Sequence, residues 1–165
     1  MPETSRPSFD LDQYVPYLLN RAGSVEAQTF TQLLAQHNIS ISTWRILAAL
    51  NQHDDQSMGE LSRSTSIEIS TLSRTIAALE KQGLVKRARK SADARVVSVQ
   101  MTQPGQRITN SIIPEAIAHE TARLADFSDQ ERRTLISLLQ RLYKNLTQTA
   151  SISSSGETYD ARPSG

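Results

Sequence analysis

The sequence predicts a mainly α-helical protein that carries one small β-wing. Two observations favour helices: apolar residues recur at three- and four-residue spacing, and Ser-x-x-Glu boxes typical of helix starts stand at Ser57 and Ser128. A third observation favours the wing, because the apolar period changes to two between residues 84 and 101. We therefore expect a helical scaffold joined to a short hairpin.

The N-terminal part predicts two helices. Pro16 fits the first turn of a helix but would kink its interior, which places the start of the first long helix near Val15. A second helix carries an apolar run around Ile46 and is expected to begin at Ser42 or Thr43, whose hydroxyl groups can cap it.

The middle of the chain predicts two further helices separated by a turn. The box at Ser57 opens a short helix around Leu61, and a longer helix runs from about Glu68 to Gln82. Gly83 stands where a left-handed residue would end that helix. The core-facing stripe of the longer helix is expected at Ile69, Leu72, Ile76 and Leu79.

Two strands and two long helices complete the expected fold. Leu84–Lys90 and Val96–Met101 are interpreted as the strands of a hairpin, with Val97, Val99 and Met101 expected on its buried side. Thr102 and Pro104 then predict a helix start, and Pro114 predicts a kink within that helix. The box at Ser128 opens the last helix.

The net charge of +1 does not indicate any class of binding partner, but the distribution of charge along the chain does. Residues 63–95 hold eight basic and three acidic side chains, so the rest of the chain is net acidic. A compact basic segment of this kind is typical of proteins that bind nucleic acid. An ordinary solvated basic face is the alternative.

Two short helices, a turn and a basic hairpin are the parts of a winged helix-turn-helix, whose second helix enters the major groove of DNA. Hydroxyl groups and one arginine lie opposite the apolar stripe of the second helix, and the cations of the hairpin suit phosphates and a narrow minor groove. An amphipathic helix with an ordinary polar face is the alternative. The candidate DNA-binding residues are Ser70, Thr71, Ser73, Arg74, Thr75, Lys86, Arg87, Arg89, Lys90, Asp93 and Arg95.

Residues 57–102 resemble the DNA-binding lobe of the MarR family, the multiple antibiotic resistance regulators. The match to the family pattern LE-x-x-G-L-[VI] is specific, and Met101 replaces the leucine that the family usually has before Thr102. The motifs that carry the resemblance are Leu79-Glu80-Lys81-Gln82-Gly83-Leu84-Val85, Asp93-x-Arg95, Val99-x-Met101-Thr102 and Trp44-Arg45-Ile46-Leu47.

The resemblance implies a homodimer, a double-stranded DNA operator and a transcriptional repressor. It also implies that Arg95 enters the minor groove while Ser70, Thr71 and Arg74 read the major groove. The apolar stripes of the terminal helices independently favour a dimer, although packing within one chain is the alternative. The candidate dimerisation residues are Leu11, Val15, Leu18, Leu135, Leu138, Leu139, Leu142 and Leu146.

Members of this family commonly bind small phenolic anions, so the resemblance implies a small-molecule effector such as an aromatic acid or its thioester. An arginine beside aromatic surface would suit a carboxylate of this kind. Trp44 in the core and the arginines in surface pairs are the alternative. The candidate ligand-binding residues are Asn20, Arg21, His37, Trp44 and Arg45.

The composition argues against other classes of function. The chain contains no cysteine, and its three histidines lack ligand spacing, so no metal site and no thiol switch are expected. Without a phosphate loop or a nucleophile motif, we expect neither an enzyme nor a cofactor. A winged-helix architectural or protein-interaction module without an effector is the alternative function.

No apolar run suits a membrane span or a secretory signal, so a cytoplasmic location is expected. The predicted organisation is a flexible N-terminus at 1–9, N-terminal helices at 10–52, the DNA-binding lobe at 53–102, dimerisation helices at 103–147 and a disordered tail at 148–165.

Overall fold

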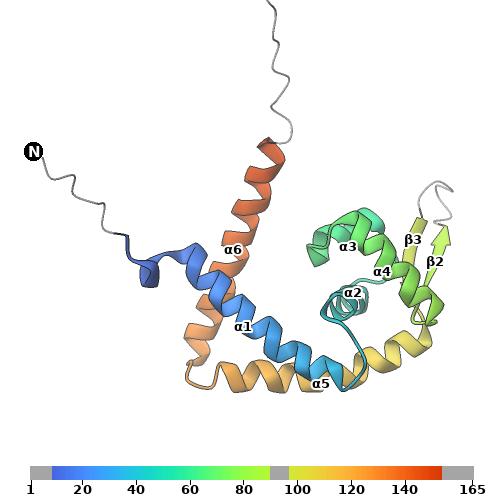
Figure 1. Cartoon of the computed structure of the whole chain (residues 1–165), viewed down its shortest axis with the longest axis horizontal. Coiled ribbons are helices and arrows are strands. Elements are labelled where there is room, and N and C mark those ends of the chain that lie inside the picture. The colour runs from blue at the N-terminus through green and yellow to red at the C-terminus, as the bar shows by residue number, and fades with distance from the viewer. Residues whose placement is uncertain (1–8, 90–96, 154–165) are drawn as a thin grey trace, which may run out of the picture. The chain divides into compact units, whose positions relative to one another are not determined.

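The computed structural model describes residues 9–89 and 97–153 of the 165-residue chain. The chain divides into two compact units, Met1–His119 and Glu120–Gly165. Figure 1 shows the mainly helical fold that the sequence predicts, with a small antiparallel sheet. The elements in order are η1 (Leu11–Gln13), α1 (Val15–Ala35), α2 (Ile41–Gln52), β1 (Gln56–Ser57), α3 (Met58–Thr65), α4 (Ile69–Lys81), β2 (Val85–Arg89), β3 (Val97–Met101), α5 (Gln103–Arg123) and α6 (Asp129–Ser153).

Three of the predicted helix starts are confirmed. Helix α1 begins at Val15, with Pro16 in its first turn. At α3, the backbone N–H of Glu60 donates to Ser57 Oγ at 3.3 Å, and the Ser57 N–H donates to the Glu60 carboxylate at 2.7 Å. The box at Ser128 opens α6 with the same pair of bonds. These caps depend on residues that are close in sequence, so a short sequence pattern is enough to predict them.

The predicted cap of α2 is wrong. Ser40 caps this helix instead of Ser42 or Thr43, because its Oγ accepts the Thr43 N–H at 3.1 Å. The preceding turn explains the difference, since Asn38 has a positive φ of 55° and leaves Ser40 as the last extended residue. Thr43 is buried inside the helix instead of standing at its end.

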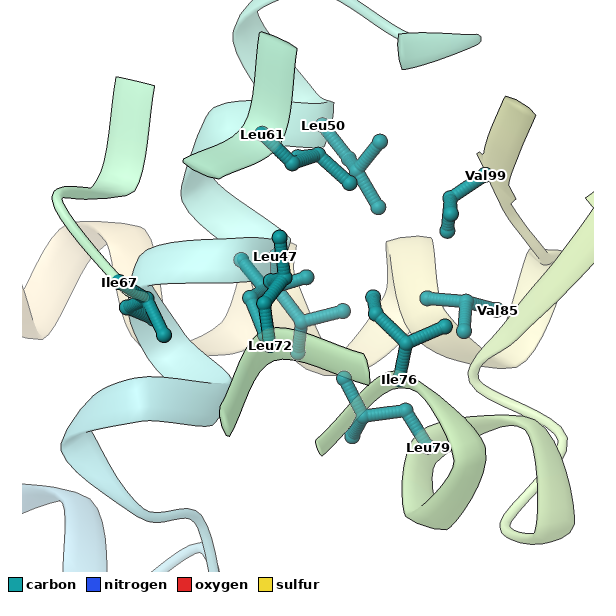
Figure 2. Packing of buried hydrophobic residues seen from close by; sticks show 10 residues of the cluster. Leu47, Leu50, Leu61, Ile67, Leu72, Ile76, Leu79, Val85 and Val99 are labelled. Carbon is teal, nitrogen blue, oxygen red and sulfur yellow. The ribbon is translucent and has the colours of Figure 1, made fainter. Parts of the chain in front are cut away.

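The main core lies among α2, α3, α4 and the sheet (Figure 2). Side chains from all these elements meet there, and burying each large aliphatic group contributes on the order of 1.5–3 kcal/mol. The core therefore makes the helix-turn-helix and the wing one body. Its buried residues are Ile46, Leu47, Leu50, Leu61, Ile67, Leu72, Ile76, Leu79, Val85 and Val99.

One member of the predicted stripe on α4 is not in this core. Ile69 leaves 54% of its surface exposed, whereas Ile67 is only 8% exposed and takes a place among the buried residues (Figure 2). The turn before α4 causes this, because the left-handed Ser66 (φ 55°) reverses the chain and directs Ile67 inward. Helix α4 then begins with a residue beyond the edge of the core.

The sheet has three strands in the order β1-β3-β2, all antiparallel, with Arg87 opposite Val99. Strand β1 was not predicted, since two residues carry no detectable period. The predicted burial of Val97 is wrong: Val97 is 41% exposed and its neighbour Ser98 is fully buried. Ser98 can be buried because its hydroxyl donates to Asp55 at 2.5 Å, which satisfies the polar group.

The start of α5 packs closely on the end of α4. Thr102 caps α5, as predicted, by accepting the Gly105 N–H at 3.2 Å, and its own hydroxyl donates to the Gly83 carbonyl at 2.6 Å. A Cβ on Gly105 would lie 2.1 Å from the Leu84 carbonyl oxygen, so this approach requires glycine. Gly83 has the predicted left-handed φ of 70°. Helix α5 continues through Pro114, and the kink there stays a prediction.

Candidate nucleic-acid interface

The turn between α3 and α4 is held by hydrogen bonds that fix the direction of α4. The Ser62 hydroxyl donates to the Ile67 carbonyl at 2.7 Å, and the Thr65 hydroxyl donates to the Leu61 carbonyl at 2.6 Å. The Ile67 N–H returns to Thr65 Oγ1 at 3.3 Å. With its inner face in the core, α4 has only one face left for a partner.

That outward face carries the residues predicted to read DNA. Ser70, Thr71, Ser73 and Arg74 are exposed, while Thr75 is half-buried and donates its hydroxyl to the Thr71 carbonyl at 2.9 Å. The guanidinium of Arg74 lies 3.5 Å from Thr71 Oγ1, at the long limit of a hydrogen bond. Arg74 can therefore leave this contact to bind a base or a phosphate.

A carboxylate caps the N-terminal end of α4. Glu68 accepts the N–H groups of Ser70 at 2.9 Å and Thr71 at 3.3 Å, and also the Ser70 hydroxyl. The hydrogen bonds from Ser70 hold the pKa of Glu68 below its usual range, and Arg74 adds to this. The charge of Glu68 occupies the helix N-terminus, so Ser70 is less available to DNA than the sequence suggests.

The wing begins beside the other end of α4. Lys86 is exposed on β2, and among the described residues it has no ion pair. Arg87 differs, because its N–H and its Nη1 donate to the Glu80 carboxylate at 3.2 and 2.9 Å. Glu80 thus attaches the wing to α4 and neutralises one of the predicted DNA-binding cations.

The predicted wing is described as far as Arg89 on its first strand. Arg89 ends β2 and pairs through its backbone with Val97. Lys90, Asp93 and Arg95 lie outside the described residues. Their predicted roles in the minor groove stay predictions.

The loop after α2 holds the wing from its opposite side. Asp55 accepts bonds from Ser98 at 2.5 Å and from Gln100 Nε2 at 3.0 Å, and Asp54 accepts the Met101 N–H at 2.9 Å. Sequence reasoning missed these anchors and also Glu80. Asp54 and Asp55 stand more than forty residues from their partners, so no local pattern could have found them.

Two of the five candidate ligand-binding residues line a cavity among the described residues. Trp44 and Arg45 line a surface cavity of about 330 Å³, together with residues of α2, His53, Gln56, Ser64 and Thr65. The Trp44 ring also packs edge-on against Phe30, with 5.9 Å between centroids. The cavity thus has an aromatic side and a cation.

The other three candidates have different surroundings. Asn20 is exposed on α1, and Arg21 lies over the Tyr17 ring at 5.4 Å and 4.0 Å from Asp12. His37 Nε2 lies 3.1 Å from the Glu115 carboxylate, which ties the end of α1 to α5. None of the three is among the lining residues of the described cavity.

The candidate dimerisation residues stay at least partly exposed in the single chain. In the first unit, Leu11, Val15 and Leu18 are exposed. In the second unit, the described part of α6 contains no buried residue. Its apolar side chains are exposed at Leu138, Leu139 and Leu146, half-buried at Leu135 and Leu142, and accompanied by exposed Ile136 and Tyr143.

Residues 9–89 and 97–153 contain no group of three or more His, Asp or Glu side chains that could hold a metal ion. Likewise, none of the described helices combines the length and the apolar character that crossing a membrane requires.

Comparison with known proteins places this geometry in a family. The family model described as MarR family matches residues 39–97. The HTH-type transcriptional regulator YxaD of Bacillus subtilis is 31% identical over 107 residues, which cover 65% of this chain and 75% of that protein.

Solved structures agree with the sequence comparison. A MarR family transcriptional regulator from Silicibacter pomeroyi is 27% identical, with a TM-score of 0.74 over 82% of this chain and 92% of that one. Bordetella bronchiseptica BpsR, whose DNA binding is regulated by 6-hydroxynicotinic acid, shares the fold at 23% identity, with a TM-score of 0.70 over 78% of this chain and 97% of that one. The chain belongs to the MarR family and is a winged helix-turn-helix, DNA-binding transcriptional regulator, not an enzyme.

Proposed function

We propose that this regulator is a homodimeric repressor that binds a pseudo-palindromic operator and is released from it by a small aromatic anion. The observation that carries the proposal is the exposed polar face of α4. Leu72 and Ile76 fix the opposite face in the core, so Thr71, Ser73 and Arg74 all point toward a partner.

The chemistry of this face suits the major groove. Arginine binds guanine through two parallel hydrogen bonds, and short hydroxyl side chains let the helix approach base edges closely. Arg74 lies in the N-terminal half of α4, the half that helix-turn-helix proteins insert into the groove. Lys86, exposed on β2, supplies a cation for the phosphate backbone.

A dimer follows from the apolar side chains that the single chain leaves exposed. Covering Leu138, Leu139 and Leu146 with a second copy would remove apolar surface from water at about 25 cal/mol per Å². A two-fold dimer presents two copies of α4 about 34–36 Å apart, one turn of DNA, and therefore prefers an inverted repeat. A bound dimer of this size represses by excluding polymerase from its site.

The cavity at Trp44 and Arg45 supports the effector. A carboxylate would pair with Arg45 while its ring lies against Trp44, and Gln52 and His53 add polar groups at the rim. BpsR provides a precedent for an aromatic acid that regulates DNA binding. Such a ligand releases DNA only if it prefers the conformation of the dimer that does not fit the operator.

The test of the DNA-binding part is selection of random DNA by the purified protein, followed by sequencing and fluorescence anisotropy on the enriched site. We expect an inverted repeat with centres one helical turn apart and an affinity that falls steeply with salt, because phosphate contacts release counterions. Enrichment of no sequence, or a flat salt response, would contradict the proposal.

The effector is tested separately with 6-hydroxynicotinic acid and benzoate as probes. At millimolar concentration, at least one of them should weaken operator binding by the wild-type protein. Arg45→Gln should bind the operator as before but lose the response to the probe, and Arg21→Gln, outside the cavity, should keep it. An equal response in Arg45→Gln would exclude this cavity.

A further inference from the structure

Ile69 is an apolar side chain at the place where the proposed DNA-reading surface begins. It is the first residue of α4 and leaves 54% of its surface exposed, although the core lies one turn away. Its exposure is a consequence of the α3–α4 turn, which places Ile67 in the core instead. Ile69 therefore contributes little to the packing of the lobe and is available to a partner.

The neighbours of Ile69 identify that partner. Residues four apart share a helix face, so Ile69 lies next to Ser73, and Ser70 follows it directly. Both serines are exposed and both belong to the face proposed to enter the major groove. The Glu68 cap does not cover Ile69, because its carboxylate bonds to Ser70 and Thr71.

Among the groups that base pairs present in the major groove, the 5-methyl group of thymine is the apolar one, and it is recognised by apolar contact. The other edges are hydrogen-bond donors and acceptors, which an isoleucine would leave unsatisfied. We propose that Ile69 is a specificity-determining residue that contacts a thymine methyl group in each half-site of the operator. This inference rests on the proposed function, since it requires α4 to enter the major groove.

The experiment replaces the thymines of the selected operator one at a time with deoxyuridine, which keeps base pairing and removes only the methyl group. For the wild-type protein, one thymine of a half-site should be sensitive, with a loss of about fourfold in affinity, as expected for one buried methyl group. Ile69→Ala should bind the two DNAs with equal affinity. The coupling between the two changes isolates the contact.

Lys86→Ala is the matched control, because it removes a proposed phosphate contact of the wing and no apolar contact. It should weaken binding to both DNAs and leave the thymine-to-uracil ratio of the wild type unchanged. A ratio of one in the wild type, or an unchanged ratio in Ile69→Ala, would overturn the inference. So would a change of oligomeric state in Ile69→Ala, since Ile69 would then contact a second copy of the chain.

Failure of the proposed function gives a different result. In that case the selection enriches no site for the wild-type protein, and both proposals are overturned together. A well-defined operator whose thymine methyl groups have no effect overturns the inference about Ile69 and leaves the regulator assignment unchanged.

Discussion

The lobe and the last helix contain similar aliphatic residues in opposite environments. In the lobe, Leu61, Leu72 and Ile76 are completely shielded from solvent. On α6 leucines recur at the same three- and four-residue spacing, and two of them, Leu138 and Leu139, are exposed. The apolar period is the same in both regions, so the difference in burial depends on which elements pack against each helix.

This difference implies that the stability of the two regions should respond differently to protein concentration. The core of the lobe closes within one chain, and its stability should not vary with protein concentration. In the proposed dimer a second copy covers the apolar face of α6, so the stability of that face should follow the monomer–dimer equilibrium. The predictions below test these two dependences, beginning with the largest effect.

Leu138→Asp should give the largest effect. A carboxylate in the proposed interface would have to be buried without a partner, so the dimer should dissociate. With one half-site bound at a time, operator affinity should fall by about 100- to 10,000-fold, the usual gain from two linked sites. Sedimentation velocity and anisotropy measure the two results. Gln130→Asp, a polar residue of the same helix, is the control, and a Leu138→Asp protein that remains dimeric would refute the interface.

Leu72→Ala tests whether the core of the lobe is stable within a single chain. Removing a fully buried leucine side chain should lower the free energy of unfolding of the lobe by about 2–5 kcal/mol. Urea denaturation at several protein concentrations should give the same loss each time. A loss that grows on dilution would show that the lobe, like α6, depends on a partner.

Two of the three cations on β2, Lys86 and Arg87, sharpen the comparison within the lobe. Lys86 is exposed, whereas the charge of Arg87 is committed to Glu80 at 2.9 Å. Lys86→Ala should therefore reduce the slope of log affinity against log salt by about 1.8, the value for one phosphate contact in each of the two half-sites. Arg87→Ala should leave the slope nearly unchanged. Equal changes of slope in both variants would mean that the pair with Glu80 opens on DNA.

Except at the cap of α2, sequence reasoning was accurate where structure depends on near neighbours. The caps at Ser57 and Ser128, the left-handed Gly83 and the start of α1 at Val15 all involve residues within one turn of each other. It also predicted the fold class and the family. The caps, the conformation of Gly83 and the start of α1 all result from local hydrogen bonding or backbone conformation, which the neighbouring residue types predict.

It failed where burial depends on distant elements. Ile69 fits the apolar period of α4, but the turn at Ser66 gives its place in the core to Ile67. Val97 and Ser98 exchange their expected environments because Asp55, more than forty residues away, satisfies the serine. The bond between Glu80 and Arg87 crosses the turn at the end of α4, and periodicity says nothing about it.

The smallest predicted effect compares the two glutamates that cap α4 and α6. Hydrogen bonds from Ser70 to Glu68, and from Ser128 to Glu131, lower the pKa of each carboxyl. A lowered pKa in the folded state means that each cap stabilises its helix above the pKa of the unfolded chain, about 4.3, and loses this effect as the pH falls through the folded value. Both carboxyl groups are exposed, so the effect is local.

Amide hydrogen exchange at Ser70 and Ser128 should measure this pH-dependent stabilisation by the two caps. In the wild type, protection of both amides relative to neighbouring residues should fall as the pH drops below about 4.3, where the carboxyl of the unfolded chain is already half protonated. Glu68→Gln should abolish the pH dependence at Ser70 alone, and Glu131→Gln at Ser128 alone, because an amide does not titrate. If Glu68→Gln also altered exchange at Ser128, the two caps would be coupled, and the effect of each cap would not be local.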